Sequence, residues 1–404
     1  MATKVIRFEL ADGPREVSGL DGYLHAVVLF CWNGTPLGRV RIEVRDGRVD
    51  ASDLWWAASA AIGKSLAPAV VDQLLAALPM DGPDPQATVV ITTHDRAEDL
   101  LRCLNAVIEH TPPQAEILVI DNAPSDDSTA EIAKNYPVRY LVERRKGASW
   151  GRRFGALAAN NEIVAYIDDD VVVGPGWLDG LLEPFANPEV AAVTGLVMPF
   201  ELETEAQEQF ELYNGFTFRG FSRQEFTAKR ISPVAAGISG ASACMAVRRA
   251  LLIELDLFAV EMGPGTVTRS GEDTYALYRL LSHGYRIVYN PKAVVWHCHR
   301  RSLQDLRSWL HGYSVGAFVF YLRCLLLHGE FVAIHNGLGW FLDHHLRQLW
   351  RGLRGCPDAQ PLDLTLAEIR GVMEAPWVYF LSRRRERALG SPPNFEGQPS
   401  GARM

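Results

Sequence analysis

The stretch that decides the fold is IVAYIDDDVVV, residues 163–173, in which an apolar strand runs directly into three aspartates. Ile163–Ile167 has the β-branched, apolar character of a buried strand. Three adjacent carboxylates repel one another, and this repulsion raises their proton affinity unless a positive charge lies among them. A hard divalent cation with oxygen ligands removes that repulsion. Asp168–Asp170 therefore predicts either a metal site or an exposed acidic turn.

The segment around this strand alternates short strands with helices. The pattern predicts strands at 88–92, 116–120, 138–142 and 163–167, and helices at 97–110, 128–136 and 150–160. Such βαβ units form an α/β fold with a doubly wound, mostly parallel sheet flanked by helices. Ligands bind these sheets beyond the carboxyl ends of the strands. We therefore expect Thr93–Asp95, Asp121 and Asp168–Asp170 to share one rim, which favours the metal site over the surface turn.

Changes in composition divide the chain into parts. Residues 1–80 show alternating strands and then a helix, which predicts a small α+β module, and residues 79–85, with their prolines and glycine, predict a linker. Residues 87–301 carry the α/β pattern, and residues 302–389 predict a helical C-terminal extension. Residues 390–404 are rich in Gly, Pro and Ser and are expected to be disordered.

Composition and charge narrow the class of protein. The chain has 404 residues and a net charge of −8, which argues against a nucleic-acid binder, because such proteins need a basic face. Its 6 cysteines show no CxxC spacing, and the N-terminus lacks the apolar run of a signal peptide. The most apolar span, Val315–Leu327, contains Arg323 and is too short to cross a bilayer. We therefore expect a soluble, cytoplasmic protein.

A basic cluster beside aromatic side chains ends the predicted helical extension. Arg383–Arg387 follows closely on Trp377, Tyr379 and Phe380. This pattern is typical of a solvated helix end, and it also suits docking on an anionic membrane surface. Both interpretations stay open, so peripheral membrane contact is one of the predicted associations.

Motifs with chemical character follow one another between residues 88 and 301. They are VVITTHDR (89–96), EILVIDNAPSDDST (116–129), GASWGRRFGA (147–156), DDD (168–170), GASACMAVRR (240–249) and GEDTYALYRLLSHGYRIVYNPKAVVWHCHR (271–300). In this order they resemble the family 2 glycosyltransferases, enzymes of the GT-A fold that use nucleotide sugars. The resemblance departs from the family pattern where Pro124 adds a residue before Ser125, and where Gly151 and Arg153 replace Ala and Asn.

The resemblance implies a donor site and a metal. Asp168–Asp170 would occupy the position of the metal-binding Asp-x-Asp, with Asp170 a direct ligand of Mg²⁺ or Mn²⁺ and Asp168 supporting it. Asp121 resembles the residue that hydrogen-bonds the nucleobase, and Arg152 would meet the base or phosphate unless it is a solvent-facing helix residue. The implied donor-binding residues are Thr92, Asp95, Asp121, Arg152, Asp168 and Asp169.

The resemblance also implies a general base and a further metal ligand. Asp273 matches the family's base, which removes the acceptor hydroxyl proton in an inverting displacement, and Glu272 would hold acceptor or sugar hydroxyls. His297 and His299 alternate along a strand predicted at Ala293–His299, so both point to one face. His297 matches the family's metal-binding histidine, although each is also typical of a hydrogen-bonded core residue.

The predicted function is therefore inverting transfer of a sugar from a nucleotide-diphosphate donor to an acceptor hydroxyl. One alternative is a sugar nucleotidyltransferase, but His94-Asp95-Arg96 lacks the glycines of its phosphate loop. Another is a non-catalytic sugar- or protein-binding module, which the clustered carboxylates disfavour. The acceptor stays open among a glycan, a lipid-linked molecule, a peptide and a small molecule. It is expected to meet Phe200–Ser232, whereas Trp177 either lines the sugar pocket or packs in the core.

Overall fold

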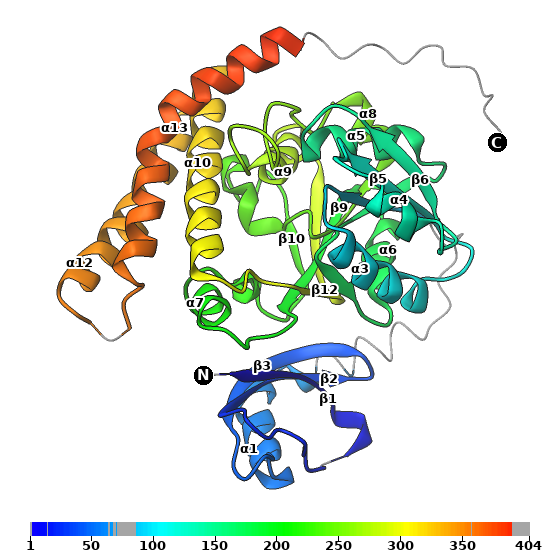
Figure 1. Ribbon diagram of the computed structural model, residues 1–404, viewed down its shortest axis with the longest axis vertical. Coiled ribbons are helices and arrows are strands. Elements are labelled where there is room, and N and C mark those ends of the chain that lie inside the picture. The colour runs from blue at the N-terminus through cyan, green and yellow to red at the C-terminus, as the bar shows by residue number, and fades with distance from the viewer. Residues whose placement is uncertain are drawn as a thin grey trace.

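In the computed structural model the chain forms a small N-terminal module, a large sheet flanked by helices and a group of long C-terminal helices (Figure 1). The structure describes residues 2–13, 15–63, 65–67, 70, 86–356 and 358–389, with only the backbone of Asn214 and Leu389. This α/β architecture confirms the predicted fold class. The predicted linker at 79–85 and the predicted tail at 390–404 lie outside the described residues, so the domain boundaries stay predictions.

The N-terminal module is a three-stranded sheet with a helix packed on it. β1 (Thr3–Glu9) pairs in parallel with β2 (His25–Trp32), which pairs antiparallel with β3 (Thr35–Glu43). Asn33-Gly34 joins β2 to β3 with positive φ at both residues, as a tight hairpin requires. α1 (Ala51–Ile62) buries Leu54, Ala58 and Ile62 against this sheet.

The module joins the rest of the chain near α7 (Glu205–Asn214). The backbone N–H of Thr3 donates to the carbonyl oxygen of Leu202 at 2.7 Å. Arg39 of β3 forms an ion pair with Glu211 of α7, whose side chain is mostly buried. Because burial reduces screening by solvent, this pair holds the module more firmly than an exposed pair would.

The large sheet has nine strands in the order β10-β12-β9-β11-β7-β4-β5-β6, with β8 paired to β12. β4, β5, β6, β7, β9 and β12 run in one direction, and β8, β10 and β11 run in the other. The strands are β4 (Ala87–Thr93), β5 (Glu116–Asn122), β6 (Arg139–Glu143), β7 (Ile163–Asp168), β8 (Val171–Val173), β9 (Val190–Pro199), β10 (Gln224–Phe226), β11 (Cys244–Arg248) and β12 (Arg286–His297).

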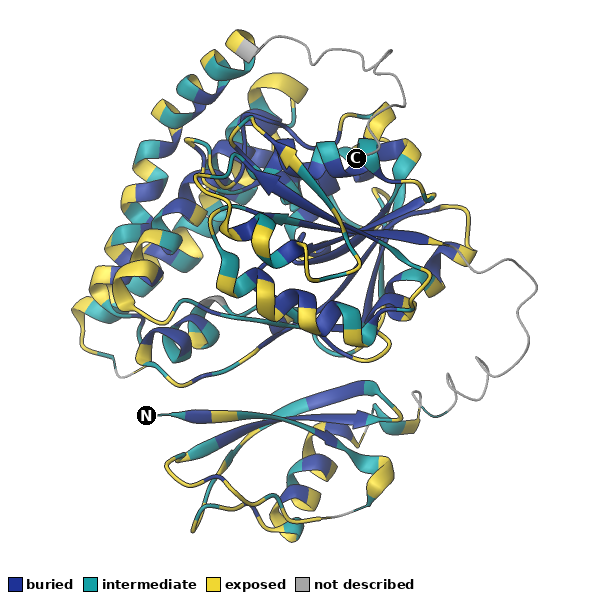
Figure 2. Cartoon of the chain, turned by 45° about the vertical axis from the view of Figure 1, so that its right-hand side comes forward, coloured by how far each residue is buried: buried dark blue, intermediate teal, exposed yellow. Residues whose placement is uncertain are grey.

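Helices cover both faces of this sheet, and its strands are therefore apolar on both sides (Figure 2). Val89 and Ile91 of β4 pack in one layer with Leu100, whereas Val90 packs in the other layer with Ala156. The helices here are α3 (Ala97–His110), α4 (Ser128–Ala133), α5 (Ala148–Ala158), α6 (Trp177–Leu182), α8 (Arg249–Glu254) and α9 (Glu272–Ser282). Short 3₁₀ turns are η1 (Leu10–Asp12), η2 (Glu183–Ala186), η3 (Phe216–Arg219) and η4 (Pro233–Ser239).

The C-terminal helices form a layer beside the sheet domain (Figure 1). α10 (Leu303–His328) and α13 (Leu362–Leu389) pack along each other, helped by Gly371, where a Cβ would lie 2.5 Å from the carbonyl oxygen of His311. The segments between them are α11 (Val332–Trp340), the π-helix η5 (Phe341–Leu346) and α12 (Arg347–Leu353).

α10 is longer than the apolar span predicted from the sequence. It begins at Leu303, and by length and composition it could cross a membrane, although 50% of its most apolar window is buried inside the protein. The prediction that this region is too short was therefore wrong, because the helix extends well before Val315.

Candidate functional site

The carboxyl ends of β4, β5 and β7 lie side by side on one edge of the sheet. In the ladders, Thr92 is paired with Asp168, and Thr93 is paired with Asp121. The strand-end residues predicted from the sequence therefore share a rim, as parallel neighbouring strands require.

Asp169 and Asp170 are buried, and both carboxylates pair with the guanidinium of Arg96. Arg96 Nη1 lies 3.1 Å from Asp169 Oδ1 and 3.0 Å from Asp170 Oδ2. Thr93 Oγ1 also donates to Asp169 at 2.8 Å. His297 Nε2 lies 3.4 Å from Asp170 Oδ1, so Asp170 is the aspartate of this pair that faces a histidine.

The neighbours of Asp169, Asp170 and His297 shift the pKa values of these side chains in different directions. Burial, together with the charge of Asp170, raises the pKa of Asp169 to about 7. Burial acts on Asp170 too, but His297, Arg96 and Arg300 outweigh it and hold the pKa of Asp170 below its usual range. Burial lowers the pKa of His297 to about 4. A carboxylate that keeps its charge beside an imidazole nitrogen is a donor pair that suits a divalent metal.

Arg152 links the aspartate strand to α9. Its Nη2 lies 2.9 Å from Asp168 Oδ1, and its Nη1 lies 2.6 Å from Glu272 Oε1. Burial raises the pKa of Glu272 to about 7 even beside this guanidinium. Arg152 is only 4% exposed, so the interpretation as a solvent-facing helix residue is wrong. It instead holds two carboxylates that the sequence places far apart.

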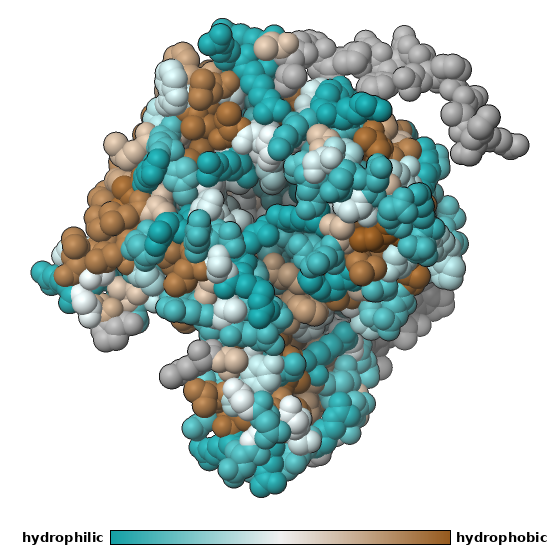
Figure 3. All heavy atoms as spheres, in the orientation of Figure 1, coloured by the Kyte–Doolittle hydropathy of each residue, from teal (hydrophilic) through white to brown (hydrophobic). Residues whose placement is uncertain are grey.

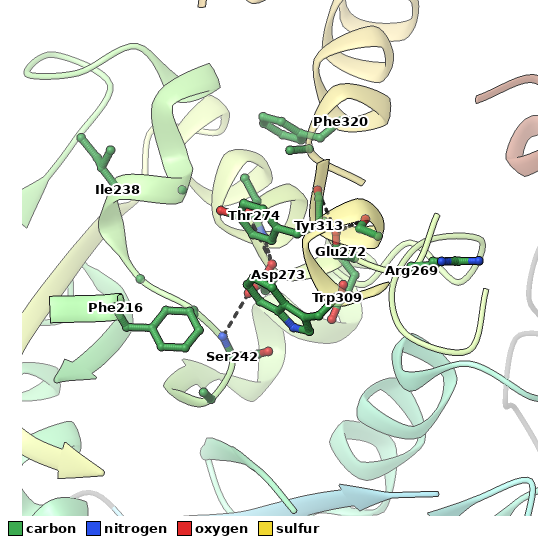
Figure 4. Close-up of a pocket in the computed structure, with 18 of the residues that line it drawn as sticks. Phe216, Ile238, Ser242, Arg269, Glu272, Asp273, Thr274, Trp309, Tyr313 and Phe320 are labelled. Carbon is green, nitrogen blue, oxygen red and sulfur yellow. Dashed lines mark hydrogen bonds between the residues drawn. The ribbon is translucent and has the colours of Figure 1, made fainter. Parts of the chain in front are cut away.

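Asp273 lies in the first turn of α9. The preceding Gly271 has φ of 92°, and a Cβ there would lie 2.9 Å from the carbonyl oxygen of Gly316, so only glycine allows α9 to start against α10. Asp273 Oδ1 accepts the N–H of Thr274 at 2.6 Å, and Oδ2 accepts the N–H of Ser242 at 3.3 Å (Figure 4). The carboxylate is therefore oriented by backbone and stays half-buried.

A cavity of about 1300 Å³ joins these groups, because Asp168, Asp273 and His297 all line it. Its other wall comes from the C-terminal helices, which sequence reasoning did not place here. Trp309 and Tyr313 stack at 5.1 Å between ring centroids, and their spacing of four residues on a helix was the available signal. Further lining side chains include Phe216, Tyr321, His335, Trp340 and His344.

Thr92, Asp95 and Asp121 lie on the rim but outside the lining of this cavity. Asp121 Oδ2 accepts the hydroxyl of Tyr140 at 2.6 Å, and burial raises the pKa of Asp121. Within the described part of the chain, Asp121 Oδ1 is buried with no partner in hydrogen-bonding geometry. Asp95 Oδ1 accepts the N–H of Ser125 at 2.9 Å. Among the predicted donor-binding residues, Arg152 and Asp168 line the cavity, whereas these three lie on the rim outside it.

His299 lies behind His297 rather than beside the aspartates. Their Nδ1 atoms are 3.0 Å apart, and His299 Nε2 lies 3.2 Å from Glu211 Oε2. Because Glu211 also pairs with Arg39, a chain of contacts runs from Asp170 to the N-terminal module. β12 ends at His297, so the strand predicted through His299 was two residues too long. This arrangement favours His297 over His299 as a metal ligand.

Two aromatic predictions have different outcomes. Trp177 is fully buried, and its Nε1 donates to Thr111 Oγ1 at 3.3 Å, so it packs in the core and the sugar-pocket interpretation is wrong. From the segment expected to meet the acceptor, Phe216 and Phe218 line the cavity, whereas Phe210 packs in an apolar cluster.

Comparison with known proteins identifies similar sequences. Residues 88–255 match the profile of the family described as Glycosyl transferase family 2. The Pre-mycofactocin glycosyltransferase of Mycobacterium tuberculosis is 27% identical over 231 residues, which are 56% of this chain and 46% of that protein. Glycosyltransferase AglE of Haloferax volcanii is 31% identical over 121 residues, 28% of this chain and 40% of AglE. The chain therefore spans less than half the length of these relatives.

A solved structure shares the architecture. The mannosyltransferase PcManGT from Pyrobaculum calidifontis, solved in complex with GDP-Man and Mn²⁺, superposes with a TM-score of 0.50. The match covers 78% of this chain and 95% of PcManGT at 16% sequence identity. At that identity the likeness concerns the fold alone.

Proposed function

We propose that this chain, which carries a glycosyl transferase family 2 domain over residues 88–255, transfers a sugar from a nucleotide-diphosphate donor to an acceptor hydroxyl with inversion. The observation that carries the proposal is the shared cavity, which Asp168 lines at the end of β7 and Asp273 lines at the start of α9. An inverting transfer needs its leaving group and its base on opposite faces of the reacting sugar. A donor on the rim and an acceptor in the cavity would meet this requirement.

Asp170 and His297 are proposed to hold an Mg²⁺ or Mn²⁺ ion, with support from Asp168. The donor set fits such an ion, because a carboxylate that keeps its charge faces an imidazole nitrogen at 3.4 Å. When bound, the ion would offset charge that develops on the departing diphosphate. The Mn²⁺ in the PcManGT complex is consistent with this assignment.

The nucleotide is proposed to lie along Thr92, Asp95 and Asp121. The buried Asp121 Oδ1, which lacks a partner within the described residues, could accept an N–H from a nucleobase. Asp169 is held by Thr93 and therefore shapes the rim beside the diphosphate. Arg152 is proposed to meet the donor while it keeps Asp168 in place.

Asp273 is proposed to take the proton of the acceptor hydroxyl. As the acceptor oxygen bonds to the anomeric carbon, the bond from that carbon to the diphosphate oxygen breaks, and the proton passes to the carboxylate. The N–H groups of Thr274 and Ser242 hold this carboxylate in the cavity. Glu272 lines the same cavity and is proposed to hold acceptor or sugar hydroxyls.

The acceptor is proposed to lie against the aromatic wall formed by Trp309, Tyr313 and Trp340. Aromatic rings offer flat apolar faces to a sugar ring or a hydrocarbon chain. A glycan, a lipid-linked molecule, a peptide and a small molecule all stay open as acceptors. The experiment that tests the proposed reaction is the anomeric configuration of its product, once a donor is identified by thermal stabilisation with Mn²⁺.

An exposed apolar stripe on the C-terminal helices is proposed to contact an anionic membrane surface. From α11 to α12, exposed apolar side chains recur at every fourth position, at Ile334, Leu338, Leu342, Leu346 and Trp350. On α13, exposed apolar side chains include Leu366, Met373, Trp377 and Phe380. Figure 3 shows apolar residues gathered along this edge of the molecule. The exposed Arg384 and Arg387 follow the stripe, so its charge suits anionic lipid.

Anionic vesicles are therefore expected to bind the full chain. Replacing Trp377 and Phe380 together by Ser should lower the partition coefficient at least about tenfold. Burying each ring in the membrane contributes roughly 1.5–3 kcal/mol to binding, and the serines lose this contribution. Co-sedimentation with phosphatidylserine-containing vesicles measures this change. Trp56→Ser is the matched control, because Trp56 is 72% exposed, like Phe380, but lies in the N-terminal module. Equal partition of all variants would contradict the membrane contact. The cytoplasmic location of the protein stays a prediction.

A further inference from the structure

A cluster of two histidines and a glutamate lies where η5 meets α13, on different elements from the aspartate rim. The ligand atoms of His344, His345 and Glu368 all lie within 4.8 Å of one another. His344 Nε2 is 3.5 Å from Glu368 Oε1. His345 is fully buried and Glu368 is 1% exposed, so the cluster is inside the protein.

Several polar atoms of this cluster have no hydrogen-bond partner among the described residues. Within the described ranges, both ring nitrogens of His345, the Nε2 of His344 and the Oε1 of Gln360 are buried with no hydrogen-bond partner. Buried polar groups in proteins are almost always paired, because an unpaired one destabilises the folded state. Several such atoms in one place indicate that something outside the chain pairs with them.

The ring of His345 is surrounded by aromatic side chains. Its ring lies against those of Trp340, Phe341 and Phe318, at 4.9, 5.9 and 5.9 Å between centroids. Neither ring nitrogen of His345 has a hydrogen-bond partner among the described residues, so its aromatic neighbours leave the imidazole available to a ligand.

The two adjacent histidines lie on an unusual stretch of backbone. In a regular α-helix, successive side chains point about 100° apart, so two adjacent residues do not share a target. Phe341–Leu346 is instead π-helical, a rare conformation that is frequent at functional sites. The two rings lie 5.0 Å apart with their planes at 90°, and both have a nitrogen near the Glu368 carboxylate.

We propose that His344, His345 and Glu368 bind a divalent cation of the zinc class, at a site separate from the donor metal. Two imidazole nitrogens and a carboxylate oxygen are typical Zn²⁺ ligands, whereas Mg²⁺ prefers oxygen ligands throughout. Gln360 Nε2 donates to Glu368 Oε2 at 3.0 Å and so orients the carboxylate. The free Oε1 of Gln360 is available as a further donor.

The proposed ion would fix one wall of the large cavity. His344 and Trp340 line that cavity, and Glu368 belongs to α13, which packs on α10 behind it. A metal that joins η5 to α13 would hold this wall at a constant distance from Asp273. Binding would therefore stabilise the folded protein, because the unfolded chain has no preformed site.

Zn²⁺ titration of the chelator-treated full chain tests this proposal. We expect one equivalent of Zn²⁺ by metal analysis and a rise in Tm on its addition. Glu368→Gln keeps the shape of the side chain but removes the charge, and His345→Phe places an apolar ring in an aromatic setting. Both variants should lose the bound equivalent, with affinity at least about 100-fold weaker, as expected when a metal ligand is removed. The Tm of metal-free His345→Phe should equal or exceed that of the metal-free parent.

Two controls separate this site from the donor site and from surface binding. Asp170→Ala should keep the Zn²⁺ equivalent and its Tm response even if donor binding fails, so failure of the proposed function leaves this result unchanged. His335→Gln should behave like the parent, because His335 lines the same cavity outside the cluster. Full Zn²⁺ binding by Glu368→Gln and His345→Phe would overturn the proposal. Binding that disappears in Asp170→Ala would overturn it equally. If His345→Phe does not fold, Glu368→Gln alone decides.

Discussion

Asp273→Asn is expected to stop sugar transfer while the donor still binds. Asn keeps the size of Asp and the oxygen that accepts the N–H of Thr274, so the start of α9 should stay intact. It cannot take up a proton, and the loss of a general base lowers the rate by about 10²–10⁴-fold. Turnover of the nucleotide sugar and calorimetric donor binding with Mn²⁺ present measure the two effects separately.

The matched control for this variant is Asp305→Asn. Asp305 lines the same cavity from α10, but it is exposed, and its carboxylate accepts a hydrogen bond from the Ser302 hydroxyl at 2.6 Å. We expect it to turn over donor at close to the parent rate. Full turnover by Asp273→Asn would contradict its role as base. Synthesis of a nucleotide sugar from a nucleoside triphosphate and a sugar phosphate would instead support the nucleotidyltransferase alternative.

Asp170→Ala is expected to abolish donor binding that depends on Mn²⁺. The carboxylate faces His297 at 3.4 Å, and its removal leaves Arg96 and Arg300 with one anion fewer to oppose them. Loss of a metal ligand should weaken binding by more than about 100-fold. Thermal stabilisation by the donor, with Mn²⁺ and with chelator, measures the change.

The control for Asp170→Ala is Asp99→Ala, which removes a carboxylate from the neighbouring helix α3. Asp99 pairs with Arg102 near the surface and contacts none of the proposed donor residues by ion pair. It should leave donor affinity unchanged. Equal stabilisation of Asp170→Ala and the parent by donor and Mn²⁺ would refute the assignment of Asp170 as a metal ligand.

The sequence predicted those parts of the fold and site that depend on local pattern. The apolar run Ile163–Ile167 and its neighbours alternate with helices, and this order was enough to predict the mostly parallel sheet. Parallel neighbours bring their carboxyl ends together, so the common rim of Asp121 and Asp168 also followed. Their roles in donor and metal binding stay predictions.

Local sequence patterns could not predict contacts between segments that lie far apart in the sequence. Arg152 and Glu272 are 120 positions apart, and nothing near either residue signals their ion pair. The spacing of four residues between Trp309 and Tyr313 suits one helix face, but nothing in the sequence shows that this face lines a cavity with Asp273.

The cluster of His344, His345 and Glu368 was equally hidden. It depends on a π-helical turn meeting α13, and adjacent histidines are not a recognised metal spacing on a regular helix.

By contrast, one departure from the family pattern, Gly151 in place of alanine, is explained by the neighbouring side chain. A Cβ at Gly151 would lie 2.4 Å from Thr92 Cγ2, so alanine does not fit where glycine stands.

The central claim is that a donor bound on the rim at Asp168–Asp170 meets an acceptor held before the base Asp273, in the cavity that Asp168 and Asp273 both line. The most direct measurement is the anomeric configuration of the product, read by NMR from a reaction of the full chain with its identified donor and Mn²⁺. A single displacement with Asp273 as base predicts a product whose anomeric configuration is opposite to that of the donor. A product that retains the configuration of the donor would contradict this account.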